Sequence, residues 1–511
     1  MNSIEQLVYF GDSLTDDGAI FELTEEVLFL GVPFTAAGYD GRFSDGPVYS
    51  AYATDLLGIE TVETFAIASA RAVGSRSLQD FLDGNGLNLL KKPGADAGIL
   101  ATDINIGAQV NRYLAEGPVA PGTAASLLIG LNDFNNFTPS SSDPLAVLLE
   151  AQALITDVVT STLTAAGTLA AAGVETIILN TLPESLFFPG SQLAPVELQE
   201  LGTFALDAHN DALIAGAAAL PVEVKVVDFQ ALSAEIIADP LTFGFVAPLG
   251  APKILSAVPQ VSLTDGLSVE VEENPLAATL DDDQFGFFDF LHPTTAMHGV
   301  LGSFQAASLT HRVSIGESMV ETGRGRDLVL SGDGDDQILT GGGRDIVFSG
   351  LGDDQASGQR GRDILAGGAG DDMMRGGFGA DVVAGGTGDD KIYGGGNSDV
   401  LIDGLGSDMA FGGAGADAFL FVEAELIGGT SGEDQDVFRG GTGTDTLVLA
   451  LTEETRAAVE AELTNSRFQT LESIGVEVRS IEEFVFVDSR DELNDLDGSF
   501  RLDEADVWGL I

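Results

Sequence analysis

A serine that follows an apolar run is the first candidate for chemistry in this chain. The stretch LVYFGDSLTDDG, residues 7–18, places Ser13 after a run of strand type and a Gly-Asp pair. A hydroxyl at the end of a buried strand can act as a nucleophile once a base removes its proton. The same residue types also cap a helix at a strand-to-helix junction, so this stretch alone leaves both interpretations open.

The base for such a serine is expected among the histidines. His292 lies in FFDFLHPTTAMHG, where Asp289 stands three residues before it. A carboxylate at that spacing reaches the imidazole, fixes its tautomer and leaves the second ring nitrogen for the serine. We expect His209 to lie mid-helix and half exposed. The pattern predicts Ser13 as the nucleophile, Asp289 as the orienting carboxylate and His292 as the base. It favours His292 for that role over the remaining histidines, which are His209, His298 and His311.

The negative charge that develops on an attacked carbonyl needs hydrogen-bond donors. The segment IGLNDF, residues 129–134, offers the side-chain amide of Asn132 together with Gly130, and the backbone N–H of Ser13 offers a further donor. Gly and Asn also form ordinary turns, which is the better interpretation if this segment is considered alone.

These residues need a scaffold that brings distant turns together. Aliphatic runs at 7–10, 61–67, 126–130, 175–180 and 223–229 alternate with segments of helical apolar spacing at 47–57, 105–115, 144–172 and 195–220. This alternation predicts an α/β fold with a doubly wound parallel sheet covered by helices on both faces. Ligands of such sheets bind beyond the carboxyl ends of the strands. The turns that carry Ser13 and Asn132 are therefore expected to meet in one crevice.

Four blocks of sequence resemble, in order, those of the GDSL, or SGNH, esterases and lipases. The blocks are Gly11-Asp12-Ser13-Leu14, GRFSDGPV at 41–48, Gly130-x-Asn132-Asp133 and Asp289-x-x-His292. The resemblance covers nearly all of residues 5–311. It implies Ser13 as nucleophile, His292 as general base, Asp289 as its orienting residue and Asn132 as an oxyanion donor.

One position departs from the family pattern. The second block of the family normally carries a glycine whose backbone N–H completes the oxyanion hole, and Ser69 of TFAIASARA stands in its place. A backbone N–H survives this exchange, while the conformation that glycine permits is harder for serine to adopt. The expected oxyanion site therefore comprises Ser13, Ser69, Asn132 and Gly130. We expect the exchange to affect the rate of the reaction more than the assignment to the family.

After residue 321 the composition changes to glycine and aspartate in a strict nine-residue register. The register aspartates are Asp327, Asp336, Asp345, Asp354, Asp363, Asp372, Asp381, Asp390, Asp399, Asp408 and Asp417. This pattern predicts a parallel β-roll in which glycines make the turns, an aliphatic residue points inward and each aspartate faces calcium. A disordered acidic linker has a similar composition, but a linker does not keep its register.

A second period of 18 residues lies inside the first. The residue before the register aspartate is an acid in one alternating series, at Asp335, Asp353, Asp371 and Asp389, and Arg or a small residue in the other. Two nonapeptides therefore make one coil, with chemically different turns on its two edges. We call the edge whose turns end at Asp336, Asp354, Asp372, Asp390 and Asp408 the paired-acid edge. We expect it to bind calcium more tightly than the other edge.

The repeats resemble those of RTX proteins, which type I machinery exports by means of an uncleaved C-terminal signal. The resemblance implies a secreted, extracellular protein whose export partner is a type I secretion apparatus. Calcium is the expected cofactor, structural and confined to the repeats, with none for catalysis. Because stacked carboxylates must be neutralised, folding of the repeats and calcium binding are expected to be one event.

The overall charge restricts the partners. The chain has 22 basic and 80 acidic residues, a net charge of −58, which repels nucleic-acid phosphates and anionic lipid surfaces. Cysteine is absent, so the fold needs no disulfide. The opening MNSIEQ lacks the features of a signal peptide, and the most apolar stretch, near 158–174, is interrupted by Thr and Gly. We expect no nucleic-acid partner and no stable membrane insertion.

The expected organisation has four parts. These are a hydrolase domain at 1–312, a linker at 313–321, the RTX roll at 322–420, and a C-terminal cap with the secretion signal at 421–511. The last part contains two further repeat-like turns, at Asp436 and Asp445. A roll of this kind has an open apolar end, so a covering segment is needed.

Two functions of different class fit the sequence. The first is a secreted serine esterase or lipase that hydrolyses carboxylic esters through an acyl-enzyme. Its substrate could be a lipid, phospholipid included, a short acyl ester or an acetylated glycan. The second is a calcium-dependent extracellular surface or matrix-binding protein with a degenerate hydrolase domain, which the exchange at Ser69 and the long repeat region would suit.

Overall fold

The computed structural model describes residues 4–28, 42, 44, 46–84, 91–92, 95–141, 143–238, 240, 243, 245, 249–262, 266–275, 285–289, 291–316, 318–423, 435–464 and 466–487. The chain divides into two compact units. The first comprises Met1–Ser233 with Ala247–Leu309, and the second comprises Ala234–Val246 with Thr310–Ile511. The block at 41–48 is described only in part, and the expected secretion signal beyond residue 487 lies outside the described residues.

The first unit is built on a parallel sheet of five strands in the order β2-β1-β3-β4-β5. The strands are β1 Gln6–Gly11, β2 Thr61–Thr64, β3 Thr123–Leu128, β4 Thr176–Asn180 and β5 Glu223–Val227. All neighbouring pairs are parallel, which confirms the predicted doubly wound sheet. The strand order reverses at β1, so the switch point at which such sheets bind ligands lies between β1 and β3.

Helices pack on both faces of this sheet. Val8 and Phe10 of β1 share a core with residues of α5, α7 and α9, while the Tyr9 hydroxyl points to the other face and donates to Gln305 of α11 at 2.9 Å. The alternation of side chains along a strand produces these two faces. The helices of this unit are α1 Ala19–Val27, α2 Tyr49–Leu57, α3 Leu78–Gly84, α4 Ala97–Leu100, α5 Ile106–Glu116, α6 Leu131–Asn135, α7 Pro144–Ala172, α8 Pro189–Gln192, α9 Val196–Ala217, the start of α10 Phe229–Ala238, and α11 Thr295–Thr310, with a 3₁₀ turn at Ser185–Phe187.

One feature of this unit was not predicted from the sequence. A hairpin of two antiparallel strands, β6 Ile254–Ser262 and β7 Gly266–Glu273, precedes the His292 segment. Among the described helices, α7 alone is long and apolar enough to cross a membrane, which by itself is weak evidence for a spanning helix. Val158, Ala166 and Leu169 of α7 belong to the core that covers the sheet.

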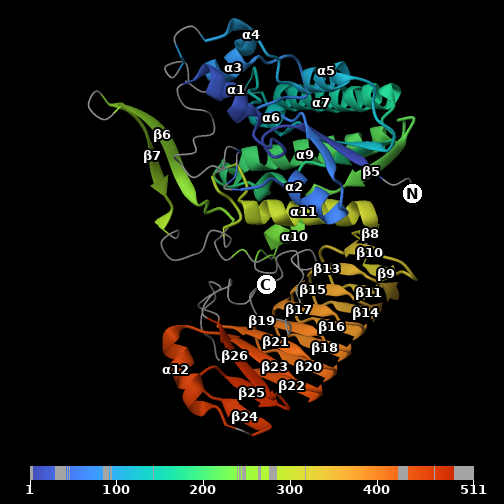
Figure 1. Cartoon of the computed structure of the whole chain (residues 1–511), viewed down its shortest axis with the longest axis vertical. Coiled ribbons are helices and arrows are strands. Elements are labelled where there is room, and N and C mark those ends of the chain that lie inside the picture. The colour runs from blue at the N-terminus through green and yellow to red at the C-terminus, as the bar shows by residue number, and fades with distance from the viewer. Residues whose placement is uncertain are drawn as a thin grey trace. The chain divides into compact units, whose positions relative to one another are not determined.

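The second unit consists of two long parallel sheets whose strands alternate along the chain (Figure 1). Strands of one sheet pair with strands 18 residues away, as in Ile346↔Ile364, which confirms two nonapeptides per coil. One sheet contains β8 Arg312–Ile315, β10 Asp327–Leu330, β13 Ile346–Leu351, β15 Ile364–Ala369, β17 Val382–Thr387, β19 Val400–Leu405, β21 Ala418–Val422, β23 Thr446–Ala450 and β26 Glu483–Val487. The other contains β9 Met319–Glu321, β11 Gln337–Leu339, β14 Gln355–Gly361, β16 Met373–Phe378, β18 Lys391–Gly396, β20 Met409–Ala414, β22 Asp436–Thr442, β25 Val476–Arg479 and β24 Phe468–Leu471, with β12 Gly342–Gly343 beside β14.

A column of apolar side chains fills the space between the two sheets. Its members recur every nine residues from Val320 to Phe419, two positions after the aspartates of the register, and are fully or almost fully buried. This confirms that the aliphatic position points inward. Residues 313–321, expected as a linker, contain β9 and most of β8, which extend the sheets by one strand each.

The end of the column is joined by residues from the C-terminal part of the second unit. Val459 of α12, Glu453–Glu462, and Leu471, Val476 and Ile481 belong to the same buried cluster as the roll. The described residues thus supply apolar cover where the regular coils stop. The expected domain boundaries themselves stay predictions.

Candidate active site

Ser13 lies at the carboxyl end of the central strand β1, in a turn that its neighbours fix. A side chain at Gly11 would place its Cβ 2.4 Å from the Leu128 carbonyl oxygen, so only glycine fits where β1 passes β3. The amide of Gln109 accepts from the Gly11 N–H at 2.9 Å and donates to the Gly11 carbonyl at 2.7 Å. The turn that follows leaves Ser13 only 7% exposed, at the switch point of the sheet.

The loop before α11 brings a histidine to this serine. The Nε2 atom of His292 lies 3.2 Å from Ser13 Oγ, across 279 residues of chain. Its Nδ1 lies 2.9 Å from Asp289 Oδ2, and the Asp289 carboxylate also accepts the backbone N–H groups of Leu291 and His292, each at 2.8 Å. These contacts orient the ring so that Nε2 faces the serine hydroxyl, which is the arrangement a base needs to take the hydroxyl proton.

Asn132 and Gly130 follow the neighbouring strand β3. Gly130 has a φ of 129°, and a Cβ there would lie 3.0 Å from Val158. Asn132 stands in the first turn of α6, and its Nδ2 donates to the Ala70 carbonyl at 3.1 Å. The Asn132 amide is thereby held against the loop that carries Ser69.

Ser69 keeps the backbone conformation expected of a glycine. Its φ is 66°, in the left-handed region that non-glycine residues seldom adopt. Nη1 of Arg76 donates to both the carbonyl oxygen and the hydroxyl of Ser69, at 2.9 and 2.7 Å. The exchange of glycine for serine has therefore left the turn in place, with an arginine bound to the strained residue.

Three buried carboxylates around the serine were not assigned a role from the sequence. Asp16 accepts the Ala68 N–H at 2.7 Å and the first N–H groups of α1, and Asp133 accepts the Ala72 N–H at 2.8 Å. Asp16 and Asp133 thereby connect the loop of Ser69 to the turns that carry Ser13 and Asn132. Burial, above all, raises the pKa of Asp12 to about 7 and those of Asp16 and Asp133 to about 6. Asp12 and Asp133 lie inside blocks that the sequence had already marked.

Two of the remaining histidines, His209 and His298, are buried and contact partners other than the serine. His209 is fully buried, which corrects the expectation that it is half exposed, and its Nδ1 lies 3.1 Å from Asn210 Oδ1. His298 is also buried, and its Nδ1 accepts the Tyr49 N–H at 3.2 Å. Burial lowers the pKa of His209 to about 4 and that of His298 to about 3, so both rings are neutral near pH 7.

Comparison with known protein families identifies the families that match the two parts of the chain. The profile of the GDSL-like lipase/acylhydrolase family matches residues 7–303. The chain belongs to the GDSL-like lipase/acylhydrolase family. The RTX calcium-binding nonapeptide repeat also matches, at 321–356, 348–383, 357–392, 384–419 and 430–448, so a GDSL domain is followed by RTX repeats.

Individual relatives of this GDSL protein are distant. The chain is 24% identical over 327 residues to the phosphatidylcholine-sterol acyltransferase of Aeromonas hydrophila, covering 58% of this chain and 88% of that protein. A solved crystal structure aligns with a TM-score of 0.31 at 18% identity, covering 60% of this chain and 98% of the solved chain.

The RTX repeats of this GDSL protein place the register aspartates in two buried columns. On the paired-acid edge, the Asp354 N–H donates to Asp372 Oδ1 at 2.8 Å, and on the other edge the Asp345 N–H donates to Asp363 Oδ1 at 3.0 Å. The same link joins successive coils along both columns. Within the described ranges, the second oxygen has no hydrogen-bond donor in Asp345, Asp354, Asp363, Asp372, Asp381, Asp390, Asp399 and Asp417.

These columns fit calcium. Burial, followed by repulsion between neighbouring carboxylates, raises the pKa of Asp390 to about 9 and those of Asp354 and Asp399 to about 8. Ionised carboxylates therefore need a compensating cation here, and calcium prefers oxygen ligands in flexible geometry. RTX repeats bind calcium, and the orphaned oxygens of the columns are the groups that would hold it.

The second acids of the paired-acid edge behave differently from the register aspartates. Asp353, Asp371 and Asp389 are exposed, and each accepts the backbone N–H of the residue one coil later, at 2.9 to 3.1 Å. They form a hydrogen-bonded ladder on the surface of the roll. Tighter calcium binding at this edge stays a prediction.

Proposed function

We propose that this protein is a secreted serine esterase or lipase that hydrolyses carboxylic esters through an acyl-enzyme at Ser13. The observation that carries the proposal is the chain of contacts from Asp289 to His292 to Ser13, at 2.9 and 3.2 Å. Membership of an acylhydrolase family supports an ester as the substrate.

The first half-reaction follows from this geometry. Ser13 Oγ attacks the carbonyl carbon of the ester while its proton passes to His292 Nε2, and Asp289 stabilises the resulting imidazolium. The tetrahedral oxyanion accepts hydrogen bonds from the N–H groups of Ser13 and Ser69 and from the Asn132 amide. Asn132 Nδ2 carries two hydrogens, so it can keep its bond to Ala70 and still donate to the oxyanion.

The bond to the alcohol breaks as His292 returns its proton to the leaving oxygen, which leaves an acyl group on Ser13 and ends the first half-reaction. The second half-reaction regenerates the enzyme. Water gives a proton to His292 and attacks the acyl carbon, and the bond from that carbon to Ser13 Oγ then breaks as His292 returns the proton to Oγ, which releases the acid. The catalytic steps need no metal ion, and calcium acts in the repeats as a structural cofactor.

Secretion is part of the proposal. RTX repeats are typical of secreted proteins and suggest export by a type I apparatus. Calcium is scarce inside cells and plentiful outside, so repeats that require it would fold only after export. Comparison of the cell-associated and culture-medium fractions, with and without a type I exporter, tests this part.

A serine-to-alanine exchange tests the assignment of the nucleophile. We expect Ser13→Ala to lower kcat/KM on p-nitrophenyl acetate and on longer p-nitrophenyl esters by at least about 10⁴-fold. Ser308→Ala is the matched control, because it removes a hydroxyl from a buried serine of α11. Activity retained by Ser13→Ala would reject the nucleophile, and an inactive wild type would favour the calcium-dependent surface or matrix-binding protein.

The left-handed φ of Ser69 supports the enzyme over that alternative. A degenerate site has no reason to keep a serine at φ 66°, a conformation that costs about 1 kcal/mol or more for a non-glycine residue. The strain is compensated by the two hydrogen bonds from Arg76. The turn that presents the Ser69 N–H is thus maintained despite its cost.

Acyl transfer is the second candidate, favoured by the name of the Aeromonas relative. In that reaction an alcohol, rather than water, attacks the acyl carbon on Ser13. Incubation with phosphatidylcholine vesicles, with and without cholesterol, separates the two functions. Free fatty acid in both mixtures indicates a lipase, and cholesteryl ester in the second indicates an acyltransferase. An acyl-chain-length profile then distinguishes lipid, short acyl and acetylated glycan substrates.

A further inference from the structure

Each turn on the paired-acid edge begins five residues before its register aspartate. The residue at that position is Ser or Gly in four successive coils and Asp in the fifth. A Cβ at Gly367 or Gly385 would lie 2.3 Å from Oδ2 of the register aspartate five residues later. A side chain at this position therefore points at the column of carboxylates. The occupants in chain order are Ser331, Ser349, Gly367, Gly385 and Asp403.

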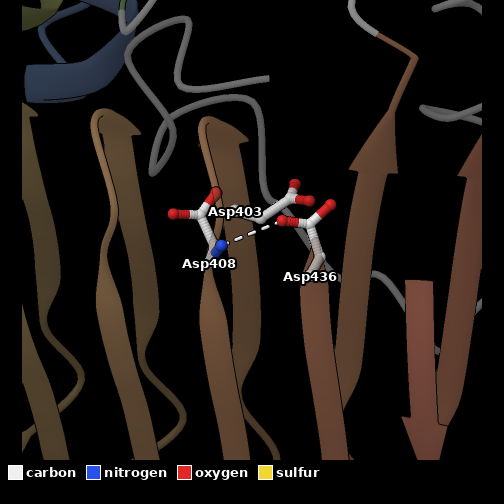
Figure 2. Close-up of side chains that lie close together, drawn as sticks. All are labelled: Asp403, Asp408 and Asp436. Atoms are coloured by element: carbon white, nitrogen blue, oxygen red, sulfur yellow. Dashed lines mark hydrogen bonds between the residues drawn. The ribbon is translucent and has the colours of Figure 1, made fainter. Parts of the chain in front are cut away.

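Asp403 places a third carboxylate beside two register aspartates. Figure 2 shows its side chain between those of Asp408 and Asp436, and ligand oxygens from the three lie within 4.8 Å of one another. Asp403 is only 2% exposed, and within the part of the chain that the structure describes its Oδ1 has no hydrogen-bond donor. The Asp408 N–H donates to Asp436 Oδ1 at 2.9 Å, as between the earlier coils.

A cluster of this kind needs a cation to neutralise its negative charge. The Asp403 Oδ1 is buried without a donor among the described residues, which is costly, and three buried carboxylates this close together repel one another. Two oxygens that bind one Ca²⁺ at 2.3–2.6 Å are at most about 5 Å apart. The three ligand oxygens, all within 4.8 Å of one another, can therefore bind a single Ca²⁺.

The cluster lies at the level where the regular coil is interrupted. Asp408 and Asp436 are 28 residues apart, whereas Asp390 and Asp408 are 18 apart. The sheets nevertheless keep their register across this longer connection, with Met409 opposite Val437. The Asp408–Asp436 hydrogen bond therefore joins the last strands of the roll to the regular coils, and a cation bound at this level would strengthen that link.

We propose that Asp403, Asp408 and Asp436 form a calcium site with one carboxylate more than the earlier levels of the paired-acid edge. Asp403 makes it the tightest site of that edge, because calcium affinity rises with the number of charged ligands. Asp403 departs from the glycine of the repeat pattern, so the register alone does not reveal this site. The last strands are then attached to the roll at lower calcium than the earlier coils require.

Calcium titration of the full chain tests the proposal. The metal-free protein is titrated by calorimetry as wild type, Asp403→Asn, Asp403→Gly and Asp157→Asn. Asp403→Asn keeps the shape and removes the charge, Asp403→Gly restores the residue found at position 385, and Asp157→Asn removes an exposed acid from α7, outside the repeats. Both Asp403 variants should weaken the tightest class of sites by about tenfold, and the control by less than about twofold.

Thermal unfolding supplies a second readout. Without calcium, removal of the Asp403 carboxylate should not lower the residual β signal of the repeats, whereas at saturating calcium it should lower the unfolding midpoint. If Asp403→Asn gains no β signal at saturating calcium, the result for Asp403→Gly is used, since glycine already occupies this position one coil earlier. An unchanged tightest class in the titration, or an unchanged midpoint at saturating calcium, overturns the proposal.

Discussion

Buried carboxylates near Ser13 and in the repeats are stabilised differently. Asp16 accepts N–H groups from four residues, Asp133 from two, and Asp289 from two residues and a histidine ring. In the roll, a register aspartate such as Asp363 accepts one N–H on Oδ1, and its Oδ2 has no donor among the described residues. The first unit thus stabilises Asp16, Asp133 and Asp289 with its own backbone, while Asp12 accepts the Leu14 N–H on Oδ1 and has no donor on Oδ2 among the described residues. The aspartate columns of the second unit depend on an ion from solution.

Removal of calcium should give the largest effect. We expect a chelator to abolish the β signal of the repeats, because repulsion between their stacked carboxylates is then uncompensated. Ester hydrolysis should persist to lower free calcium than the β signal does. Circular dichroism and p-nitrophenyl ester hydrolysis, measured along one series of calcium buffers, give the two midpoints. Magnesium is the control ion and should not restore the signal. Coincident midpoints would contradict the separation of the two units.

Loss of a backbone-bound carboxylate should impair the first unit specifically. Asp16→Ala breaks the link to the Ala68 N–H and should lower kcat/KM by about 10²-fold, comparable to the loss of one oxyanion donor. Asp157→Ala on the exposed side of α7 is the charge control. Hydrolysis by Asp16→Ala at the rate of the control would show that the Ser69 loop does not need this anchor.

Acid should partly replace calcium in the repeats. The pKa values of Asp354, Asp390 and Asp399 are raised to about 8, 9 and 8, chiefly by burial, against about 4 in an unfolded chain. Their protonation therefore stabilises the folded roll fully below about pH 4, and this stabilisation is lost as the pH rises through 8 to 9. Circular dichroism of the metal-free chain should show a larger β signal of the repeats at pH 5 than at pH 9. With saturating calcium the difference should shrink or reverse, because protons then compete with the ion. A metal-free β signal that rises with pH would contradict this account.

Exchange of the strained serine should have the smallest effect. Ser69→Gly relieves the positive φ but loses the hydroxyl contact to Arg76, so kcat/KM should change by less than about threefold. Arg76→Met, which also removes the bond to the Ser69 carbonyl, should lower kcat/KM more. Ester hydrolysis by the two variants gives the comparison. A large gain in Ser69→Gly would mean that the serine limits the oxyanion site.

The sequence predicted those features that local pattern encodes. The doubly wound sheet followed from the alternation of strand and helix runs, and the roll followed from the nine-residue register. The hairpin β6–β7 was not predicted, although residues 267–272 of β7 alternate apolar and polar side chains as a strand does. Its partner β6 contains Pro259, which is atypical of a paired strand. The burial of His209 was also missed, because α9 is covered along that face by groups such as Phe134, which are distant in sequence.

The sequence by itself determined the family, the register of the repeats and the residue types that can attack an ester or bind calcium, since short motifs and periods carry that information. Only the tertiary structure decided which groups meet. It placed Ser13 Oγ 3.2 Å from His292 Nε2, held Ser69 at φ 66° and brought Asp403 to Asp436. The reason is physical: contacts between distant segments depend on how sheets and coils pack, whereas periodicity depends only on neighbours along the chain.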